Sequence, residues 1–353
     1  MEILVYGAGA VGGYLGGKLA LAGRRVTLVM RPDTAAVINR DGLYITESNG
    51  TCRAPVRAVG ELAAAFAATA GYDLIIVGMK AYDLEDALAQ LGPFCPKPAR
   101  VMTTQNGIGV EELVAGRVGA ERTLVGSVTI PISRGDPGHL VVERSGRGLG
   151  IAPVWPNQVT DEWVALFRAA EINAGACSDY RAMKWSKAFL NIMGNATSAI
   201  LNRPPAELYR LRPVFDLEMR MLREMLAVMK RLGIEVINLP GATARPLARA
   251  LTYAPRALLP LVFTQVIVRG RGNKMPSFHI DLAAGKRRSE IAFHNGAIAT
   301  AGKQAGVPVP VNAALNDTLQ GLCRDQSRRS WFDGRPDRLL AVVRDYEQGK
   351  ENV

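Results

Sequence analysis

The chain has 353 residues, of which 48% are hydrophobic and 21% charged, and a chain of this size and composition can bury a core in about two domains. Its net charge of +11 would suit nucleic-acid binding, but neither a nucleic-acid motif nor a basic patch interleaved with aromatic residues accompanies it. A basic surface also attracts an anionic cofactor or substrate, or serves solubility alone. The longest apolar run, residues 257–268, is shorter than the ~20 residues that a membrane span needs. We therefore expect a cytoplasmic protein that binds neither nucleic acid nor membranes.

Cysteine and histidine are too few and too scattered to predict a metal site. No C-x-x-C pair occurs, and only three histidines are present. We expect no bound metal and free thiols in a reducing compartment, at Cys52, Cys95, Cys177 and Cys323. The first apolar run begins at residue 3, so we also expect no signal or transit peptide.

The first 31 residues are typical of a βαβ unit. An apolar run at residues 3–6 leads into the glycine-rich sequence of residues 7–12, and an Ala- and Leu-rich helical stretch ends at Gly23. A second β-branched run follows at residues 26–29. Strand, glycine turn, helix and strand follow one another at the spacing this unit requires.

The glycine spacing G-x-G-x-x-G predicts a dinucleotide-binding turn. Gly7 permits the tight turn, Gly9 lets the backbone approach a pyrophosphate, and Gly12 lets the helix pack closely on the strand. The free N–H groups of the helix start face the phosphates. The alternative is a glycine-rich turn in some other α/β protein. We predict that the cofactor contacts come from Gly7, Ala8, Gly9, Ala10, Val11 and Gly12.

The end of the second strand favours NADP over NAD. An NAD-specific unit usually places Asp or Glu there, to bind the ribose 2′-hydroxyl. Here the strand runs into Arg31, whose guanidinium suits a 2′-phosphate. Asp33 stands two residues further on, and a plain surface arginine is the competing interpretation of Arg31.

Two further strand ends carry candidate ligands. Continuous apolar runs at residues 73–77 and 101–103 predict buried parallel strands, and ligands collect outside the carboxyl ends of such strands. Lys80 follows the first and is placed to reach a phosphate. Asn106 follows the second, on the expected nicotinamide side, although Asn-Gly is also an ordinary turn signal.

The chain then changes character twice. Residues 124–132, 138–143 and 148–152 read as strands separated by glycine turns, and we expect them to extend the sheet in antiparallel fashion. After a helix at residues 161–170 the pattern becomes helical, which predicts domains at 1–177 and 178–353. The expected helices span residues 180–201, 212–232, 243–253, 255–268, 276–284, 289–305, 311–323 and 335–349.

The helix expected at residues 180–201 carries an unusual polar stripe. Lys187, Asn191 and Asn195 recur at i, i+4 and i+8, with Ser198 close by. A solvated face is the alternative, but asparagine is a poor helix former that such a face would not select. The stripe therefore indicates donors and acceptors aimed at a ligand.

Taken together these motifs resemble the ketopantoate reductases (2-dehydropantoate 2-reductases). The resemblance covers nearly the whole chain and rests on Gly7-x-Gly9-x-x-Gly12, Lys80-Ala81, Asn106-Gly107, Trp185-Ser186-Lys187, Asn191, Asn195, Pro276-Ser277, Ser289-Glu290-Ile291 and Asn295-Gly296. It implies an α/β fold, with an N-terminal Rossmann-type domain and an all-helical C-terminal domain. It also implies reduction by NADPH of 2-dehydropantoate, or a related branched 2-oxo acid, to the (R)-2-hydroxy acid, as in pantothenate biosynthesis. A homodimer is compatible with it.

The resemblance also implies roles for individual residues. Lys187 would be the catalytic proton donor to the ketone, and Glu290 the catalytic carboxylate that holds the substrate. Arg31 and Lys80 would grip the 2′-phosphate of NADP. Substrate hydrogen bonds would come from Asn106, Asn191, Asn195 and Ser277, with Asn106 also beside the nicotinamide. Taken alone, Glu290 also fits a helix-start carboxylate and Ser277 an N-cap.

Three departures bear on the substrate. Lys274 and Pro205 stand where the family often has asparagine, and the segment before Glu290 is one residue longer. Extra positive charge at Lys274 would suit a more acidic substrate. The alternatives are a similar reductase acting on another 2-oxo acid or an imine, and a non-catalytic NADP-binding regulator.

Overall fold

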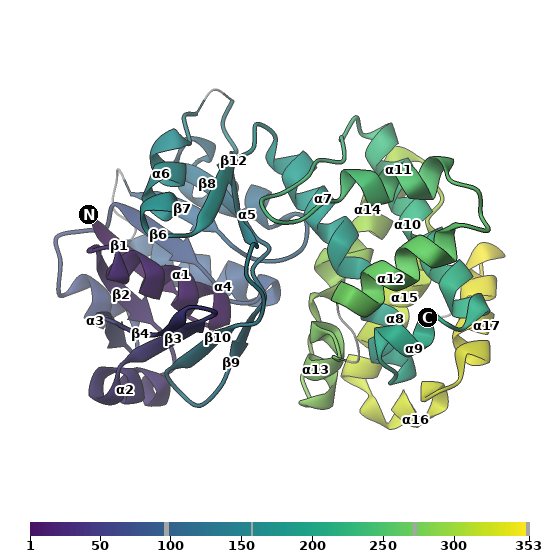
Figure 1. The fold of residues 1–353 in the computed structure, drawn as a ribbon, viewed down its shortest axis with the longest axis horizontal. Coiled ribbons are helices and arrows are strands. Elements are labelled where there is room, and N and C mark those ends of the chain that lie inside the picture. The colour runs from purple at the N-terminus through teal and green to yellow at the C-terminus, as the bar shows by residue number, and fades with distance from the viewer. Residues whose placement is uncertain (95–98, 157, 271–273, 351–353) are drawn as a thin grey trace. The chain divides into compact units, whose positions relative to one another are not determined.

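A computed structural model describes residues 1–94, 99–156, 158–270 and 274–350. Its contacts divide the chain into two compact units (Figure 1). The first unit comprises residues 1–183 with 239–242, and the second comprises residues 184–238 with 243–353. The domain limits 1–177 and 178–353 stay a prediction.

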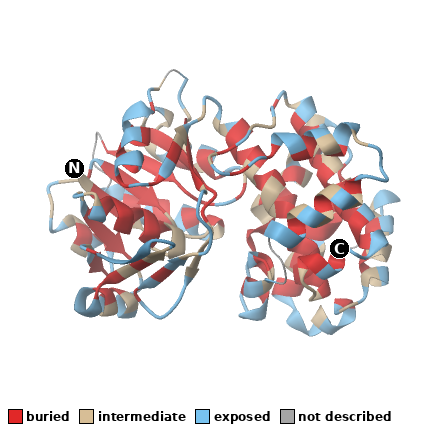
Figure 2. Cartoon of the chain, viewed as in Figure 1, coloured by how far each residue is buried: buried red, intermediate tan, exposed pale blue. Residues whose placement is uncertain are grey.

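The first unit is built on an eight-stranded sheet in the order β12-β11-β8-β7-β6-β1-β2-β5. The strands from β8 to β5 are parallel to one another, and β11 runs antiparallel to β8. Figure 2 shows this sheet as a buried layer, as expected of parallel strands that are apolar along their whole length. The Rossmann-type fold is therefore confirmed. The strands span Glu2–Tyr6 (β1), Arg25–Val29 (β2), Arg57–Val59 (β5), Leu74–Val77 (β6), Arg100–Thr103 (β7), Thr123–Val128 (β8), Gly148–Pro153 (β11) and Asn173–Ala176 (β12).

A second sheet, which the sequence pattern does not reveal, has the order β4-β3-β10-β9. The prediction that the strands of residues 124–152 extend the main sheet in antiparallel fashion is therefore wrong in part. Strand β11 does so, β8 joins the sheet but runs parallel to β7, and β9 and β10 lie outside it. The reason is that β10 pairs in parallel with β3 and packs against helix α1, which offers it an apolar surface. The strands span Leu43–Glu47 (β3), Gly50–Ala54 (β4), Ile132–Arg134 (β9) and His139–Val142 (β10).

Helix α1 (Ala10–Leu21) lies between the two sheets, and its glycines make this possible. A Cβ on Gly16 would stand 2.8 Å from Leu28 in the main sheet. A Cβ on Gly17, on the adjacent face, would stand 2.7 Å from Ile45 in the second sheet. Close packing on both faces leaves no room for side chains there. The other helices of this unit are α2 (Pro32–Asp41), α3 (Leu62–Phe66), α4 (Leu84–Leu91), α5 (Val110–Val118) and α6 (Asp161–Ala169), with 3₁₀ turns η1 (Ala81–Asp83), η2 (Gly92–Phe94) and η3 (Ala120–Arg122).

The second unit is helical, as predicted. Its core surrounds α10, whose buried face includes Leu222, Met225 and Met229. Over the described ranges, no helix combines the length and apolarity needed to cross a membrane. The elements are α7 (Tyr180–Ile192), which begins in the first unit, α8 (Asn195–Leu201), α9 (Pro205–Leu208), α10 (Arg212–Arg231), α11 (Arg245–Tyr253), α12 (Leu259–Gly270), α13 (Ser277–Ala283), η4 (Glu290–Phe293), α14 (Asn295–Ala305), α15 (Pro310–Arg324), η5 (Gln326–Arg328), α16 (Arg329–Phe332) and α17 (Pro336–Glu347).

The single helix predicted at residues 180–201 is wrong, because the chain breaks between α7 and α8. Gly194 adopts φ +64, which ends the first helix. The fully buried carboxylate of Glu218 accepts hydrogen bonds from the Gly194 amide (2.9 Å), the Thr197 hydroxyl (2.6 Å) and the Tyr209 hydroxyl (2.8 Å). A side chain distant in sequence therefore stabilises the break. The helix predicted at residues 289–305 is likewise divided into η4 and α14.

Candidate functional site

The glycine turn between β1 and α1 has the geometry that its sequence predicts. Gly7 adopts φ +81, and the amides of Gly7 and Ala8 both donate to the Val29 carbonyl at 3.0 Å. A Cβ on Gly7 would stand 2.6 Å from the Met79 backbone nitrogen. Position and conformation together require glycine.

The start of α1 fits an anionic ligand. Gly9 is its N-cap, no side chain caps it, and no acidic residue stands in its first turn. The first-turn amides of Ala10, Val11 and Gly12 belong to the set that has no partner within a helix. Since neither a side-chain cap nor a first-turn carboxylate neutralises the positive end of the helix, these residues fit the diphosphate of a dinucleotide.

Arg31 follows β2 and Lys80 follows β6, the two strands that flank β1 in the main sheet. Arg31 is the exposed N-cap of α2, and within the described ranges its guanidinium has no hydrogen-bond or ion-pair partner. Lys80 is half-buried and immediately follows Met79, which touches Gly7. The sheet therefore brings the segment ending at Lys80 to the glycine turn.

Asn106 lies on an exposed loop whose base is well fixed. Thr104 and Gln105, just before it, both donate side-chain hydrogen bonds to the Val77 carbonyl at 2.9 Å. These bonds join the end of β7 to the end of β6, from which the chain continues to Lys80. Sequence reasoning missed Thr104 and Gln105, although polar residues directly after a buried strand are a usable signal.

In the second unit Asn195 links three elements. Its Nδ2 donates to the Asn191 carbonyl on α7 at 3.3 Å, and its Oδ1 accepts the Phe278 amide of α13 at 3.3 Å. It is only 3% exposed, whereas Lys187 and Asn191 are half-buried and Ser277 is exposed. Both polar atoms of Asn195 thus contact the protein itself, which makes it a support for Asn191 and for the start of α13.

Glu290 is buried at the start of η4, where Ser289 accepts the Ile291 amide as a cap. His294, one helical turn later, hydrogen-bonds through Nδ1 to the Glu290 carbonyl at 3.0 Å. Its ring meets that of Phe278 edge to face, with centroids 5.3 Å apart. The start of α13 therefore lies between the Asn191–Asn195 pair and the Glu290 turn.

The electrostatics of His294 connect Lys187 with Glu290. Burial lowers the pKa of His294 from its ordinary value, and the hydrogen bond and charge of Glu290 oppose that shift. The positive charges of Lys184 and Lys187 lower the pKa further. Both predicted catalytic residues therefore lie within electrostatic reach of one buried imidazole. Sequence reasoning missed His294 and Lys184, and the i+4 spacing of His294 from Glu290 was the available signal.

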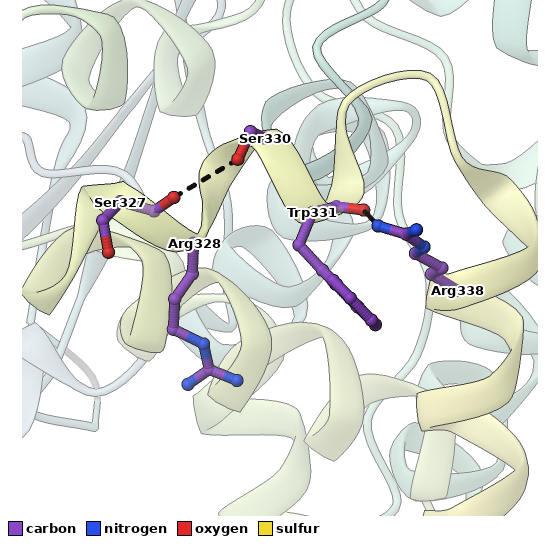
Figure 3. A pocket seen from close by; sticks show the side chains of 5 residues that line it. All are labelled: Ser327, Arg328, Ser330, Trp331 and Arg338. Atoms are coloured by element: carbon purple, nitrogen blue, oxygen red, sulfur yellow. Dashed lines mark hydrogen bonds between the residues drawn. The ribbon is translucent and has the colours of Figure 1, made fainter.

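Two surface hollows in the second unit contain none of the predicted site residues. One, of about 380 Å³, is lined by Ser327, Arg328, Ser330, Trp331 and Arg338, and Figure 3 shows Arg338 bonded to the Trp331 carbonyl. The other, of about 760 Å³, follows α10 and α11. Among the described residues no group of three or more His, Cys, Asp and Glu side chains could hold a metal ion. Cys52, Cys177 and Cys323 are free thiols, and Cys95 lies outside the described residues.

Comparisons with known proteins cover both units. The family model "Ketopantoate reductase PanE/ApbA" matches residues 3–149, and the model of the C-terminal part of the same family matches residues 179–322. A 2-dehydropantoate 2-reductase of Halobacterium salinarum is 29% identical over 331 residues, which are 92% of this chain and 100% of that protein. A ketopantoate reductase structure from Ralstonia eutropha JMP134 is 28% identical with a TM-score of 0.78, covering 93% of this chain and 100% of the other. D-mandelate dehydrogenase with NADH and anilino(oxo)acetate shares the fold at 22% identity, with a TM-score of 0.76 over 92% and 99% of the two chains.

Fold and comparisons together define an oxidoreductase in which a Rossmann-type unit precedes a helical one. The chain belongs to the ketopantoate reductase family.

Proposed function

We propose that this protein reduces 2-dehydropantoate, or a related branched 2-oxo acid, to the (R)-2-hydroxy acid with NADPH, the reduction that serves pantothenate biosynthesis. The observation that carries the proposal is the family match to both units. The matched segments contain the glycine turn and Lys80 in one, and Lys187 and Glu290 in the other. A cytoplasmic location and a homodimer remain predictions.

The choice of NADPH is supported by charge at the end of β2. No carboxylate occupies that strand end, and Arg31 has no ion pair within the described ranges. A 2′-phosphate would complete the coordination of Arg31, with Lys80 as second cation. When bound, the reduced nicotinamide supplies the hydride, and the protein supplies placement and charge.

The proton would come from Lys187. Reduction of a 2-oxo acid places negative charge on the ketone oxygen, and an ammonium that stabilises this charge can also deliver the proton. Glu290, buried beside the His294 turn, is suited to accept a hydrogen bond from a substrate hydroxyl. Asn191 and Ser277 would bind the substrate, and Asn195 would hold the helix ends in place.

The test is an assay of NADPH oxidation with 2-dehydropantoate and a panel of mono- and dicarboxylic 2-oxo acids, with and without amines. We expect 2-dehydropantoate or a branched relative to be the best substrate. Lys187→Ala should lower kcat by about 10²- to 10⁴-fold, because it removes the proton donor, while leaving the Kd for NADPH unchanged.

Lys303→Ala, which removes an exposed lysine from α14, is the matched control and should behave as wild type. Equal rates with pyruvate or 2-oxoglutarate would overturn the substrate assignment but leave a reductase. NADPH binding without oxidation by any oxo acid or imine would identify a non-catalytic regulator.

A further inference from the structure

Arg134 reaches the glycine turn from the second sheet. It ends β9 and stands directly opposite Leu140 of β10. Cross-strand neighbours project from the same face, and Leu140 faces α1, since its Cδ1 lies 3.2 Å from where a Cβ on Gly13 would be. Arg134 is therefore directed at the same helix, one turn nearer its N-terminus.

The guanidinium of Arg134 lies at the glycine over which a diphosphate passes. A Cβ on Gly9 would stand 2.5 Å from Nη2 of Arg134. In a dinucleotide-binding turn this glycine lacks a side chain so that the pyrophosphate can approach the backbone. The guanidinium thus shares the open side of the turn with the amides of α1.

Among the described residues, no acidic side chain forms an ion pair with Arg134. Within the described ranges the side chains of Arg134 and Arg31 have no hydrogen-bond or ion-pair partner. The pKa of Arg134 is lowered by burial and then by the positive charge of Arg31, so the two guanidinium groups repel each other. Two close cations at the positive end of a helix are unfavourable unless an anion joins them.

We propose that Arg134 is a phosphate-binding residue of the cofactor site, which forms with Arg31 a two-arginine clamp for the anionic groups of the dinucleotide. The inference rests on the proposed function, because it requires that a dinucleotide binds this turn. Arginine suits the role since its planar fork binds two phosphate oxygens at once. The pyrophosphate and the 2′-phosphate share this chemistry.

The experiment measures the Kd of wild type, Arg134→Gln and Arg134→Lys for NADPH and NADH by titration calorimetry at fixed ionic strength. Arg134→Gln should weaken NADPH binding by about 10- to 100-fold, the usual worth of a charge-assisted hydrogen bond. Arg134→Lys should lose less, because it keeps the charge. In steady-state assays the loss should appear as a higher KM for NADPH, because the contact removed is one that holds the bound cofactor.

The comparison of NADPH with NADH, which lacks the 2′-phosphate, identifies the phosphate group that Arg134 binds. An equal loss for NADPH and NADH means that Arg134 binds the pyrophosphate, whereas a loss for NADPH alone means that it binds the 2′-phosphate. Unchanged affinity for both nucleotides in Arg134→Gln overturns the inference. Failure of the wild type to bind either nucleotide overturns the proposed function itself, so the two failures are distinguishable.

The matched control is Arg117→Gln. Arg117 is also an exposed arginine of the first unit, in the last turn of α5, and its removal changes the net charge equally. It should bind both nucleotides as wild type does. A loss in Arg117→Gln as large as in Arg134→Gln would indicate a general charge effect, and would also overturn the inference.

Discussion

At the scale of single residues, burial of His294 makes folding stability depend on pH. Its pKa is lowered in the folded chain, first by burial, whereas the unfolded value lies near 6.5. Below that value the unfolded state takes up a proton that the folded state does not bind. Stability is therefore retained above about pH 6.5 and lost as the pH falls, at up to about 1.4 kcal/mol per pH unit for one group.

The prediction is that His294→Gln reduces this slope. Urea unfolding between pH 5 and pH 7.5 measures it, and the variant should show a weaker loss of stability at the acidic end than wild type. His279, whose pKa is also lowered by burial, leaves a smaller slope of the same sign. An unchanged slope in His294→Gln would mean that His294 titrates alike in both states.

At the scale of elements, two glycines that flank α1 allow the cost of backbone strain to be measured separately from the loss of cofactor binding. Gly7 and Gly23 have nearly the same φ, +81 and +79. A Cβ on Gly7 would meet the Met79 backbone, whereas a Cβ on Gly23 has nothing within 4 Å. Alanine at Gly7 would therefore have both a strained backbone and a steric clash, whereas alanine at Gly23 would have the strained backbone alone.

We predict that Gly23→Ala lowers the free energy of unfolding by about 1 kcal/mol, from the left-handed conformation, and keeps NADPH binding. Gly7→Ala should cost more than about 2 kcal/mol and lose NADPH binding, since the turn must shift. Urea unfolding and calorimetric titration measure the two effects. Equal behaviour of the two variants would contradict the role assigned to Gly7.

The elements also show which features the sequence could predict. The βαβ start was predictable because its glycines act within a few residues of one another. The break before Asn195 was not, because the carboxylate that stabilises it comes from Glu218 on another helix. The second sheet was hidden for the same reason, since β10 pairs with the distant β3.

The candidate site likewise contains residues that local sequence predicts and residues whose position depends on contacts distant in sequence. Lys187 and Glu290 could be proposed because they belong to recognisable local motifs. Arg134 could not, because its approach to Gly9 depends on strand register with Leu140 and on the packing of the second sheet. The i+4 spacing of His294 from Glu290 marks it as a candidate, but its burial against Phe278 depends on the packing of α13 and cannot be predicted from that spacing.

At the scale of the whole molecule, the chain consists of two units, each with its own core and its own buried tryptophan. Trp163 lies in the first unit and is 5% exposed, and Trp185 lies in the second and is 4% exposed. Trp155 and Trp331 are more than half exposed. Chains of this kind need not unfold in one step, so each unit requires its own reporter.

A ligand that binds only the folded first unit stabilises that unit by mass action, by about 2.7 kcal/mol at 100 times its Kd. We therefore predict that NADP⁺ at this concentration raises the urea midpoint reported by Trp163, in a variant whose other tryptophans are replaced by phenylalanine. In a variant that keeps only Trp185, the urea midpoint should rise only to the extent that the second unit unfolds together with the first. Gly7→Ala in the Trp163 variant is the control, and its midpoint should not respond to NADP⁺. A shift seen by Trp185 but not by Trp163 would contradict a cofactor site on the glycine turn, because binding energy must first stabilise the unit that holds the ligand.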